Sequence, residues 1–265
     1  MTAPHSSPEL ADTLKVKPRV WIGLVIWIGY AALVFTVQML SGISYDTWGD
    51  NASNLFFGVG LSLIVATAAL ALTTTVLGWW RPALFENQTS RHKWPIIAPV
   101  LLAILALANL FFTDWGSYDL AFFGASIVLL LVGFTEELTT RGLLVVALRS
   151  TLGEGWVWFL SSLLFALLHL VNIVLGQGVF VTLEQVVFAF FVGTAFYILR
   201  RTTGTLIFAM VLHAVWDFSV FAVAHGHASE LSNIVSAFLP LVGLLSLIGV
   251  IFVIRGSRER LTVPA

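Results

Sequence analysis

Residues 120–148 read LAFFGASIVLLLVGFTEELTTRGLLVVAL, a long apolar run that is interrupted by Glu136, Glu137 and Arg141. A membrane-spanning helix needs about 20 apolar residues, so this run is longer than a simple span. The apolar stretch that continues to Leu148 indicates that one helix carries all three charged residues through the membrane. Ionisable groups at such a depth are energetically costly, which makes them candidates for a functional site.

The composition of the whole chain is that of a membrane protein. Hydrophobic residues make up 58% of its 265 residues and charged residues only 10%, with a mean hydropathy of +0.96. Ordinary soluble domains are about 45–50% apolar and about 25% charged, so soluble enzymes and disordered proteins are excluded. A net charge of −1 provides no basic field for a nucleic-acid partner. The absence of cysteine excludes disulfides, thiolate nucleophiles and cysteine zinc sites.

Eight apolar runs are each long enough to cross a membrane. They cover residues 20–40, 55–80, 94–112, 120–148, 156–175, 179–199, 204–224 and 231–254. These runs are continuously apolar, whereas the strands of a membrane barrel alternate between apolar and polar residues. The chain is therefore predicted to be an all-α polytopic membrane protein, folded as a bundle of eight transmembrane helices. Pro240 lies inside the last run, which predicts a kink there.

The basic residues support this count of helices. Apart from the embedded Arg141, all Lys and Arg residues lie in the two tails or in the connections around residues 81–93, 149 and 200–201. The alternate connections, at residues 41–54, 113–118, 176–178 and 225–230, contain none. Because positive residues favour the cytoplasmic side, both termini are predicted to be cytoplasmic.

These boundaries give a simple domain organisation. Residues 1–19 and 255–265 are predicted to be cytoplasmic tails, and residues 20–254 to form one eight-helix transmembrane domain with its motifs in residues 120–224. We expect an integral, multi-pass protein surrounded by the lipid bilayer, in the plasma membrane if the organism is prokaryotic.

Four embedded ionisable groups lie at similar depths in three predicted helices. At a rise of 1.5 Å per residue, Glu136, His169 and Asp217 lie about 20 Å from the cytoplasmic ends of their helices, and His213 lies about 14 Å from its helix end. One embedded histidine often only bridges two helices through a hydrogen bond. The convergence of four groups at one level favours a functional site over that structural explanation.

Spacing along the helices assigns these side chains to faces. Glu137 and Arg141 are four residues apart, with the glutamate first, which is the favourable order for an ion pair. Glu136 is rotated by about 100° from Glu137 and can point elsewhere. The pair can also be read as a structural staple only. Two further pairs share a helix face because they too are four residues apart, namely His213 with Asp217 and Phe165 with His169.

A buried carboxylate with two imidazoles is suited to hydrolysis. A glutamate can accept a proton from water, and a histidine can donate a hydrogen bond to a developing oxyanion. The sequence contains no Gly-x-Ser-x-Gly elbow, no His-Glu-x-x-His motif and no phosphate-binding glycine loop. Activated water is therefore the expected nucleophile.

The order of these motifs resembles a known family. Glu136-Glu137-x-x-x-Arg141, Phe165-x-x-x-His169 and His213-x-x-x-Asp217 occur on successive helices, as in the CAAX protease and bacteriocin-processing (CPBP, or Abi) family, whose members include the type II CAAX prenyl endopeptidases. The resemblance covers about residues 120–220. Two positions depart from the common pattern: Asp217 stands where prenyl endopeptidases often have Asn, and Thr140 stands where Phe often precedes the arginine.

The resemblance implies an eight-helix membrane protease and a role for each catalytic candidate. Glu136 would be the base that activates water and His169 its partner, while His213 and Asp217 would stabilise the oxyanion. Glu137, Arg141 and Phe165 would support the site. A metal-free glutamate mechanism is favoured. Zinc is the alternative, because His169, His213 and Asp217 or Glu136 offer suitable ligands.

The predicted function is that of an intramembrane endopeptidase acting on a membrane-tethered peptide or protein, with a prenylated CAAX-type protein as one candidate substrate. A non-proteolytic partner that binds other membrane proteins is the first alternative. A transporter that uses the Glu/His cluster as a proton relay is the second. The lack of a half-to-half repeat in the sequence counts against the transporter.

Overall fold

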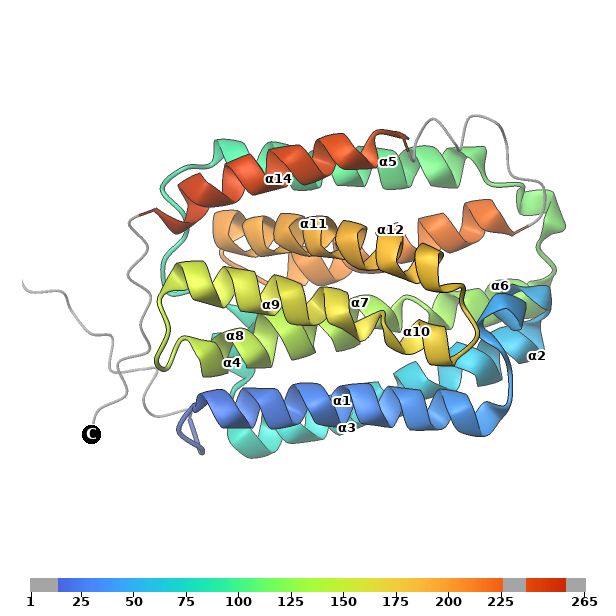
Figure 1. Cartoon of the computed structure of the whole chain (residues 1–265), viewed down its shortest axis with the longest axis horizontal. Coiled ribbons are helices and arrows are strands. Elements are labelled where there is room, and N and C mark those ends of the chain that lie inside the picture. The colour runs from blue at the N-terminus through green and yellow to red at the C-terminus, as the bar shows by residue number, and fades with distance from the viewer. Residues whose placement is uncertain (1–13, 226–236, 256–265) are drawn as a thin grey trace, which may run out of the picture.

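The computed structural model describes residues 14–225 and 237–255, and within these ranges it contains helices and no β-strand (Figure 1). Seven helices are long and apolar enough to cross a membrane. They are Val20–Ser41, Ala52–Leu77, Trp94–Phe112, Leu120–Leu148, Glu154–Val174, Val179–Thr203 and Ile207–Ala224. The chain is thus an all-helical, multi-pass membrane protein, as predicted, and seven of the eight predicted runs correspond to these spans.

Several spans consist of consecutive helical segments. Three single helices are α1 (Val20–Ser41), α11 (Val179–Thr203) and α12 (Ile207–Ala224). The composite spans are α2 (Ala52–Leu55), η3 (Phe56–Gly60) and α3 (Leu61–Leu77); η4 (Trp94–Ile96) and α5 (Ile97–Phe112); α6 (Leu120–Val128), α7 (Leu131–Glu137), η6 (Leu138–Leu143) and α8 (Leu144–Leu148); and α9 (Glu154–Leu168) with α10 (Val171–Val174). Short segments between spans are η2 (Tyr45–Asp50), α4 (Trp80–Leu84) and η5 (Trp115–Ser117).

The last predicted run corresponds to a shorter helix, α14 (Leu239–Ile254), of 16 residues. The first part of that run, residues 231–236, lies outside the described residues. Pro240 occupies the first turn of α14. The predicted kink concerns the whole run 231–254, part of which lies outside the described residues, and it stays a prediction. Proline is tolerated in a first turn because its missing N–H would have no helical partner there.

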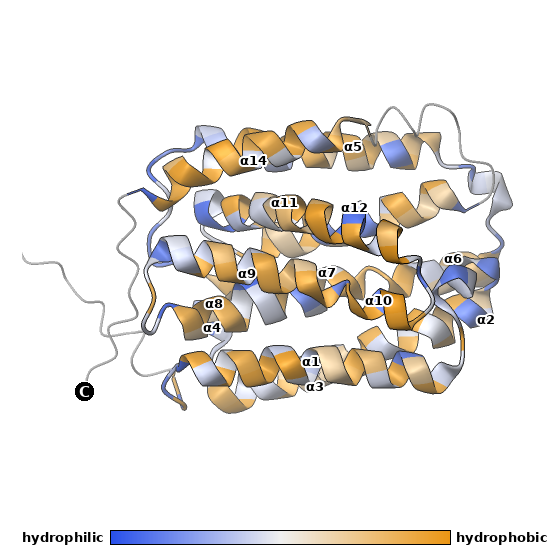
Figure 2. Cartoon of the chain, in the orientation of Figure 1, coloured by the Kyte–Doolittle hydropathy of each residue, from blue (hydrophilic) through white to orange (hydrophobic). Residues whose placement is uncertain are grey.

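The helices lie side by side along the long axis of the molecule (Figure 1). α11 packs against α9, α12 and α14, while α12 also packs against α5 and α7, and α1 packs against α8 and α3. Apolar residues dominate the helices, and polar residues gather toward the two ends of the bundle (Figure 2). This distribution suits a lipid environment along the helices and an aqueous one at both ends.

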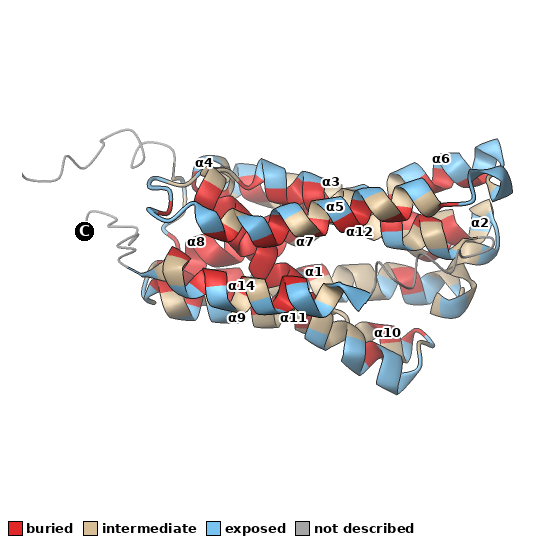
Figure 3. Ribbon diagram, turned by 90° about the horizontal axis from the view of Figure 1, so that it is seen from above, coloured by how far each residue is buried: buried red, intermediate tan, exposed pale blue. Residues whose placement is uncertain are grey.

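The motif-bearing helix runs through the centre of the bundle. Every residue from Glu137 to Arg149 is buried, and α8 lies within the most buried part of the molecule (Figure 3). The neighbouring turn between α11 and α12 is short because Gly204 adopts a left-handed conformation (φ 87°) at the end of α11. α12 therefore folds directly back against α11, with which it packs, and against α7.

Candidate active site

The first motif lies on a helix that is locally widened. Residues Leu138–Leu143 form a π-helical segment between α7 and α8. Two threonine hydroxyls support the backbone there: Thr139 donates to the carbonyl of Thr135 at 2.7 Å, and Thr140 donates to that of Glu136 at 2.6 Å. Interruptions of this kind are common at functional sites because they change which side chains share a face.

Glu137 and Arg141 form the ion pair that their spacing predicts. Arg141 Nη1 lies 2.8 Å from Glu137 Oε1, and both side chains are fully buried. The same nitrogen donates to the hydroxyl of Thr140 at 2.9 Å. The guanidinium carbon also lies 3.9 Å from the ring centre of Phe165, a cation–π contact. Arg141 thus connects α7, the π-helical segment and α9.

His213 is surrounded by carboxylates from two helices. Its Nδ1 lies 3.1 Å from Glu137 Oε1, and its Nε2 lies 3.4 Å from Asp217 Oδ2 and 4.0 Å from Glu136 Oε2. Because a carboxylate accepts hydrogen bonds, the Glu137 contact places a proton on Nδ1 and fixes the orientation of the ring. This second role of Glu137 was missed by the sequence analysis, which considered only its pairing with Arg141.

Glu136 has surroundings that differ from those of its neighbour Glu137. Its side chain is 16% exposed, and its Oε2 atom is buried without a hydrogen-bond partner among the described residues. A nearby group that sequence reasoning missed is Tyr30 of α1, whose hydroxyl lies 3.2 Å from Oγ1 of Thr135, the residue before Glu136. The sequence signal for Tyr30 is weak: it is a polar-tipped residue in a mostly apolar helix.

Phe165 brings the two histidines together. Its ring centre lies 5.5 Å from that of His169 and 5.4 Å from that of His213, and both contacts are edge-to-face. His169 directly follows the last residue of α9, and its ring contacts the same Phe165 ring as that of His213. The structure therefore gathers Glu136, His169, His213 and Asp217 into one region, and their catalytic roles stay predictions.

Two glycines allow the helices of the site to approach closely. A Cβ atom at Gly193 of α11 would overlap the guanidinium of Arg141 and would lie 2.9 Å from Phe165 Cδ1. A Cβ at Gly133 of α7 would overlap the carbonyl of Met210 and would lie 2.7 Å from the backbone nitrogen of Ala214. Small residues commonly permit such contacts between membrane helices. The sequence analysis did not single out either glycine.

The site contains histidine and carboxylate side chains, which are the residue types that bind zinc. Zinc in proteins is held by three or four converging ligands. No group of three His, Asp or Glu side chains converges in this way within residues 14–225 and 237–255. The arrangement of these residues therefore does not fit a zinc site. The preference for a metal-free mechanism stays a prediction.

Comparison with known proteins identifies the segment that carries these motifs. The family model described as type II CAAX prenyl endopeptidase Rce1-like matches residues 118–219, which is less than half of the chain. The matched segment contains all seven motif residues named above and confirms the resemblance found in the sequence. No curated protein and no solved structure gave a match.

Proposed function

We propose that this chain, whose residues 118–219 match the Rce1-like type II CAAX prenyl endopeptidase family, is an intramembrane endopeptidase that hydrolyses a peptide bond of a membrane-tethered substrate. One observation carries the proposal: Oε2 of Glu136, which accepts no hydrogen bond from any described residue, lies 4.0 Å from His213 Nε2 inside a membrane helix bundle. Water held between a base and hydrogen-bond donors is the arrangement that hydrolysis needs.

In the proposed mechanism, Glu136 takes a proton from a water molecule, and the resulting hydroxide attacks the carbonyl carbon of the scissile peptide bond. His169 helps to bind and orient this water. The carbonyl oxygen becomes an oxyanion, which accepts a hydrogen bond from Nε2–H of a doubly protonated His213, while Glu137 accepts from its Nδ1–H. When the intermediate collapses, Glu136 returns the proton to the leaving amine. The uncommitted Oε2 atom of Glu136 supports its role as the base.

The remaining motif residues hold this machinery in place. Glu137 accepts a hydrogen bond from Nδ1 of His213, which directs Nε2 toward Glu136 and Asp217. Arg141 balances the charge of Glu137, because an isolated carboxylate would be strongly destabilised in this buried position. Asp217, whose side chain is 40% exposed, would contact the substrate side of the site.

The proposed topology has eight transmembrane helices and cytoplasmic termini. Residues 20–254 would form one protease domain with α14 as its eighth helix, its motif core would span residues 120–224, and the short tails 1–19 and 255–265 would face the cytoplasm. The one-sided distribution of Lys and Arg residues supports this arrangement. A plasma-membrane location follows if the organism is prokaryotic.

The proposed substrate is a peptide or protein tethered to the same membrane, and a prenylated CAAX-type protein is the first candidate because of the family that residues 118–219 match. Membrane peptides from cells that carry the wild type or Glu136→Ala should be compared by proteomics. We expect a set of cleaved peptides that depends on Glu136. If both proteins give the same peptides while both are present in the membrane, the protease proposal is wrong and a non-proteolytic binding partner is favoured.

A further inference from the structure

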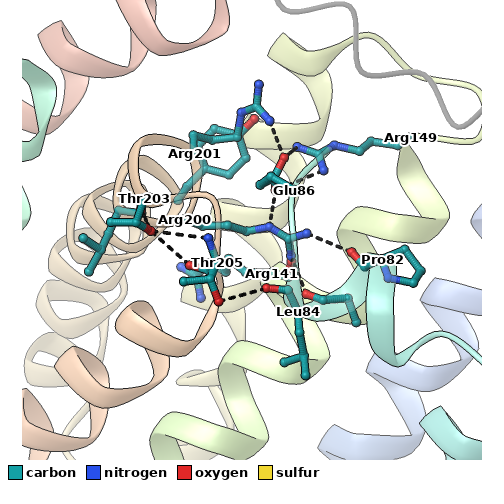
Figure 4. Close-up of polar contacts among 12 residues, drawn as sticks. Pro82, Leu84, Glu86, Arg141, Arg149, Arg200, Arg201, Thr203 and Thr205 are labelled. Carbon is teal, nitrogen blue, oxygen red and sulfur yellow. Dashed lines mark hydrogen bonds and ion pairs between the residues drawn. The ribbon is translucent and has the colours of Figure 1, made fainter. Parts of the chain in front are cut away.

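A second polar cluster lies beyond α8, at the end of the bundle that carries the basic residues (Figure 4). Its centre is Glu86, whose side chain is fully buried and forms ion pairs with Arg149, Arg200 and Arg201. Arg149 also pairs with the buried Glu154. Although burial disfavours a charged form, the carboxylates of Glu86 and Glu154 hold the pKa of Arg149 above its usual value. The cluster is therefore a set of charged groups that form ion pairs with one another.

Arg200 binds three backbone carbonyls in addition to its ion pair with Glu86. It is fully buried, and its guanidinium donates to the carbonyls of Pro82 at 3.0 Å and Ala83 at 2.9 Å. It donates a third bond to the carbonyl of Arg141 and a fourth to Glu86 (Figure 4). A planar guanidinium can satisfy several acceptors in fixed directions, whereas the ammonium of a lysine is a point charge.

The Arg141 carbonyl connects this cluster with the active site. Arg141 belongs to the π-helical segment, and its own side chain pairs with Glu137, which in turn contacts His213. A regular helix holds its carbonyls through a repeated hydrogen-bond ladder, and that regular pattern changes in a π-helical segment. Arg200 therefore donates its hydrogen bond at a place where the backbone of the motif-bearing helix is held by a contact from another helix as well as by its own hydrogen bonds.

We propose that Arg200 is a positioning residue for the active site. By holding the Arg141 carbonyl, it fixes the π-helical segment and so sets the position of the Glu137–His213 pair relative to Glu136. Glu86, which lies in the connection between α4 and η4, orients Arg200 through their ion pair. The inference rests on the proposed function only for its catalytic readout, because the position of the segment can be measured separately.

The test compares two variants of the same helix and the same cluster. In Arg200→Lys, the charge next to Glu86 is kept, but one ammonium group cannot reach the carbonyls of Pro82, Ala83 and Arg141 together. Tyr197→Phe is the matched control: Tyr197 is also fully buried and on α11, and its hydroxyl donates to Glu154. It removes one hydrogen bond from the cluster and leaves the bond to Arg141 in place.

Two measurements on purified, monodisperse protein in detergent separate positioning from simple stabilisation. The first is hydrogen–deuterium exchange of peptides that cover residues 138–146, which should be faster in Arg200→Lys than in Tyr197→Phe. The second is the pH–rate profile with a peptide identified through the Glu136→Ala comparison. A smaller folded fraction lowers the rate by the same factor at every pH. A displaced His213 also changes the pH values at which the rate rises and falls, because His213 and the carboxylates around it titrate together.

We expect Arg200→Lys to lose about 10²-fold in kcat with KM unchanged, since a misplacement of about 1 Å has effects of this size, and Tyr197→Phe to change kcat by less than about threefold. Equal exchange in the two variants, or a wild-type profile in Arg200→Lys, would overturn the inference. If Arg200→Lys does not fold, Glu86→Gln takes its place with the same expected directions. If Glu136→Ala cleaves like the wild type, the proposed function fails, and the exchange measurement still decides the role of Arg200.

Discussion

Glu136 and Glu137 are neighbours in the sequence, yet they have different surroundings. Glu137 is fully buried and contacts both Arg141 and His213 through Oε1, whereas the side chain of Glu136 is 16% exposed and approaches only His213, at 4.0 Å, among the ion pairs of the described residues. A rotation of about 100° per residue in a helix separates the two carboxylates. The sequence predicts this difference because only Glu137 has a basic residue four positions later. It does not predict the contact with His213, which depends on how α12 packs against α7.

The two glutamates form a matched pair of variants. Glu137→Gln leaves the charge of Arg141 buried without its partner, and such a change costs about 3–5 kcal/mol. We therefore expect a clearly lower thermal midpoint, lower yield and lower activity. Glu136→Gln removes no ion pair with Arg141, so its thermal midpoint should stay near that of the wild type while cleavage is lost. A thermal melt and a cleavage assay on each variant are sufficient, and reversed results would exchange the two roles.

Asp217 separates the two possible mechanisms. Asp217 Oδ2 lies 3.4 Å from His213 Nε2, and Asn at this position keeps a group that can make a hydrogen bond. In a metal-free enzyme, Asp217→Asn should retain activity within about tenfold, and a chelator should have no effect on either protein. If Asp217 holds a metal, the neutral amide binds it weakly, and activity should collapse in the variant and in the chelator-treated wild type.

At the scale of the elements, two close helix contacts position the site. Gly133 allows the backbone of α7 to meet that of α12, and Gly193 leaves room on α11 for the guanidinium of Arg141. Hydrophobic run length predicts where the helices lie along the chain, but it does not predict which glycine faces a neighbouring backbone. The sequence likewise does not predict the π-helical segment Leu138–Leu143, because its residues are compatible with a regular helix.

Replacing Gly133 tests the contact between α7 and α12. In Gly133→Ala, the added methyl group would overlap Met210 and Ala214, and overpacking of this kind costs about 1–3 kcal/mol. The helices would have to separate, which moves Glu136 away from His213. Activity should therefore fall by about 10²-fold, together with the thermal midpoint. Both quantities are measured on the purified variant.

Gly124→Ala in the same span is the matched control, because a Cβ atom at that position meets nothing within 4 Å. Alanine favours a helix over glycine by about 1 kcal/mol, so this variant should be at least as stable as the wild type and fully active. If both substitutions leave activity unchanged, close contact at Gly133 does not position the site.

At the scale of the whole molecule, composition and run length predict the class and most of the spans, because a lipid environment restricts helices to long apolar segments. The cluster around Glu86 shows what they leave out. Residues 85–92 carry no motif, and a single glutamate in a polar connection resembles a solvated loop residue. The Glu86 side chain is buried because four segments meet in the folded bundle: the connection after α4, the end of α8, the start of α9 and the end of α11.

The orientation of the bundle is the last prediction. With cytoplasmic termini, reporter fusions at Trp48, Trp115 and Gln177 should all lie outside, and a fusion at Gln88 should lie inside, because the basic residues occupy only alternate connections. An inside signal at any of the first three positions contradicts this orientation.

The helix α14 decides between seven and eight crossings. Its 16 residues span about 24 Å, which is less than the roughly 30 Å of a hydrocarbon core, so length alone does not establish that it crosses. It is continuously apolar apart from Ser246, and it packs against both α5 and α11, which are themselves spans. A helix in this position should cross the membrane with them. A fusion after Arg255 should therefore report the same side as one at Gln88. If it reports the opposite side, the chain crosses seven times, and the cytoplasmic placement of its C-terminal tail is wrong.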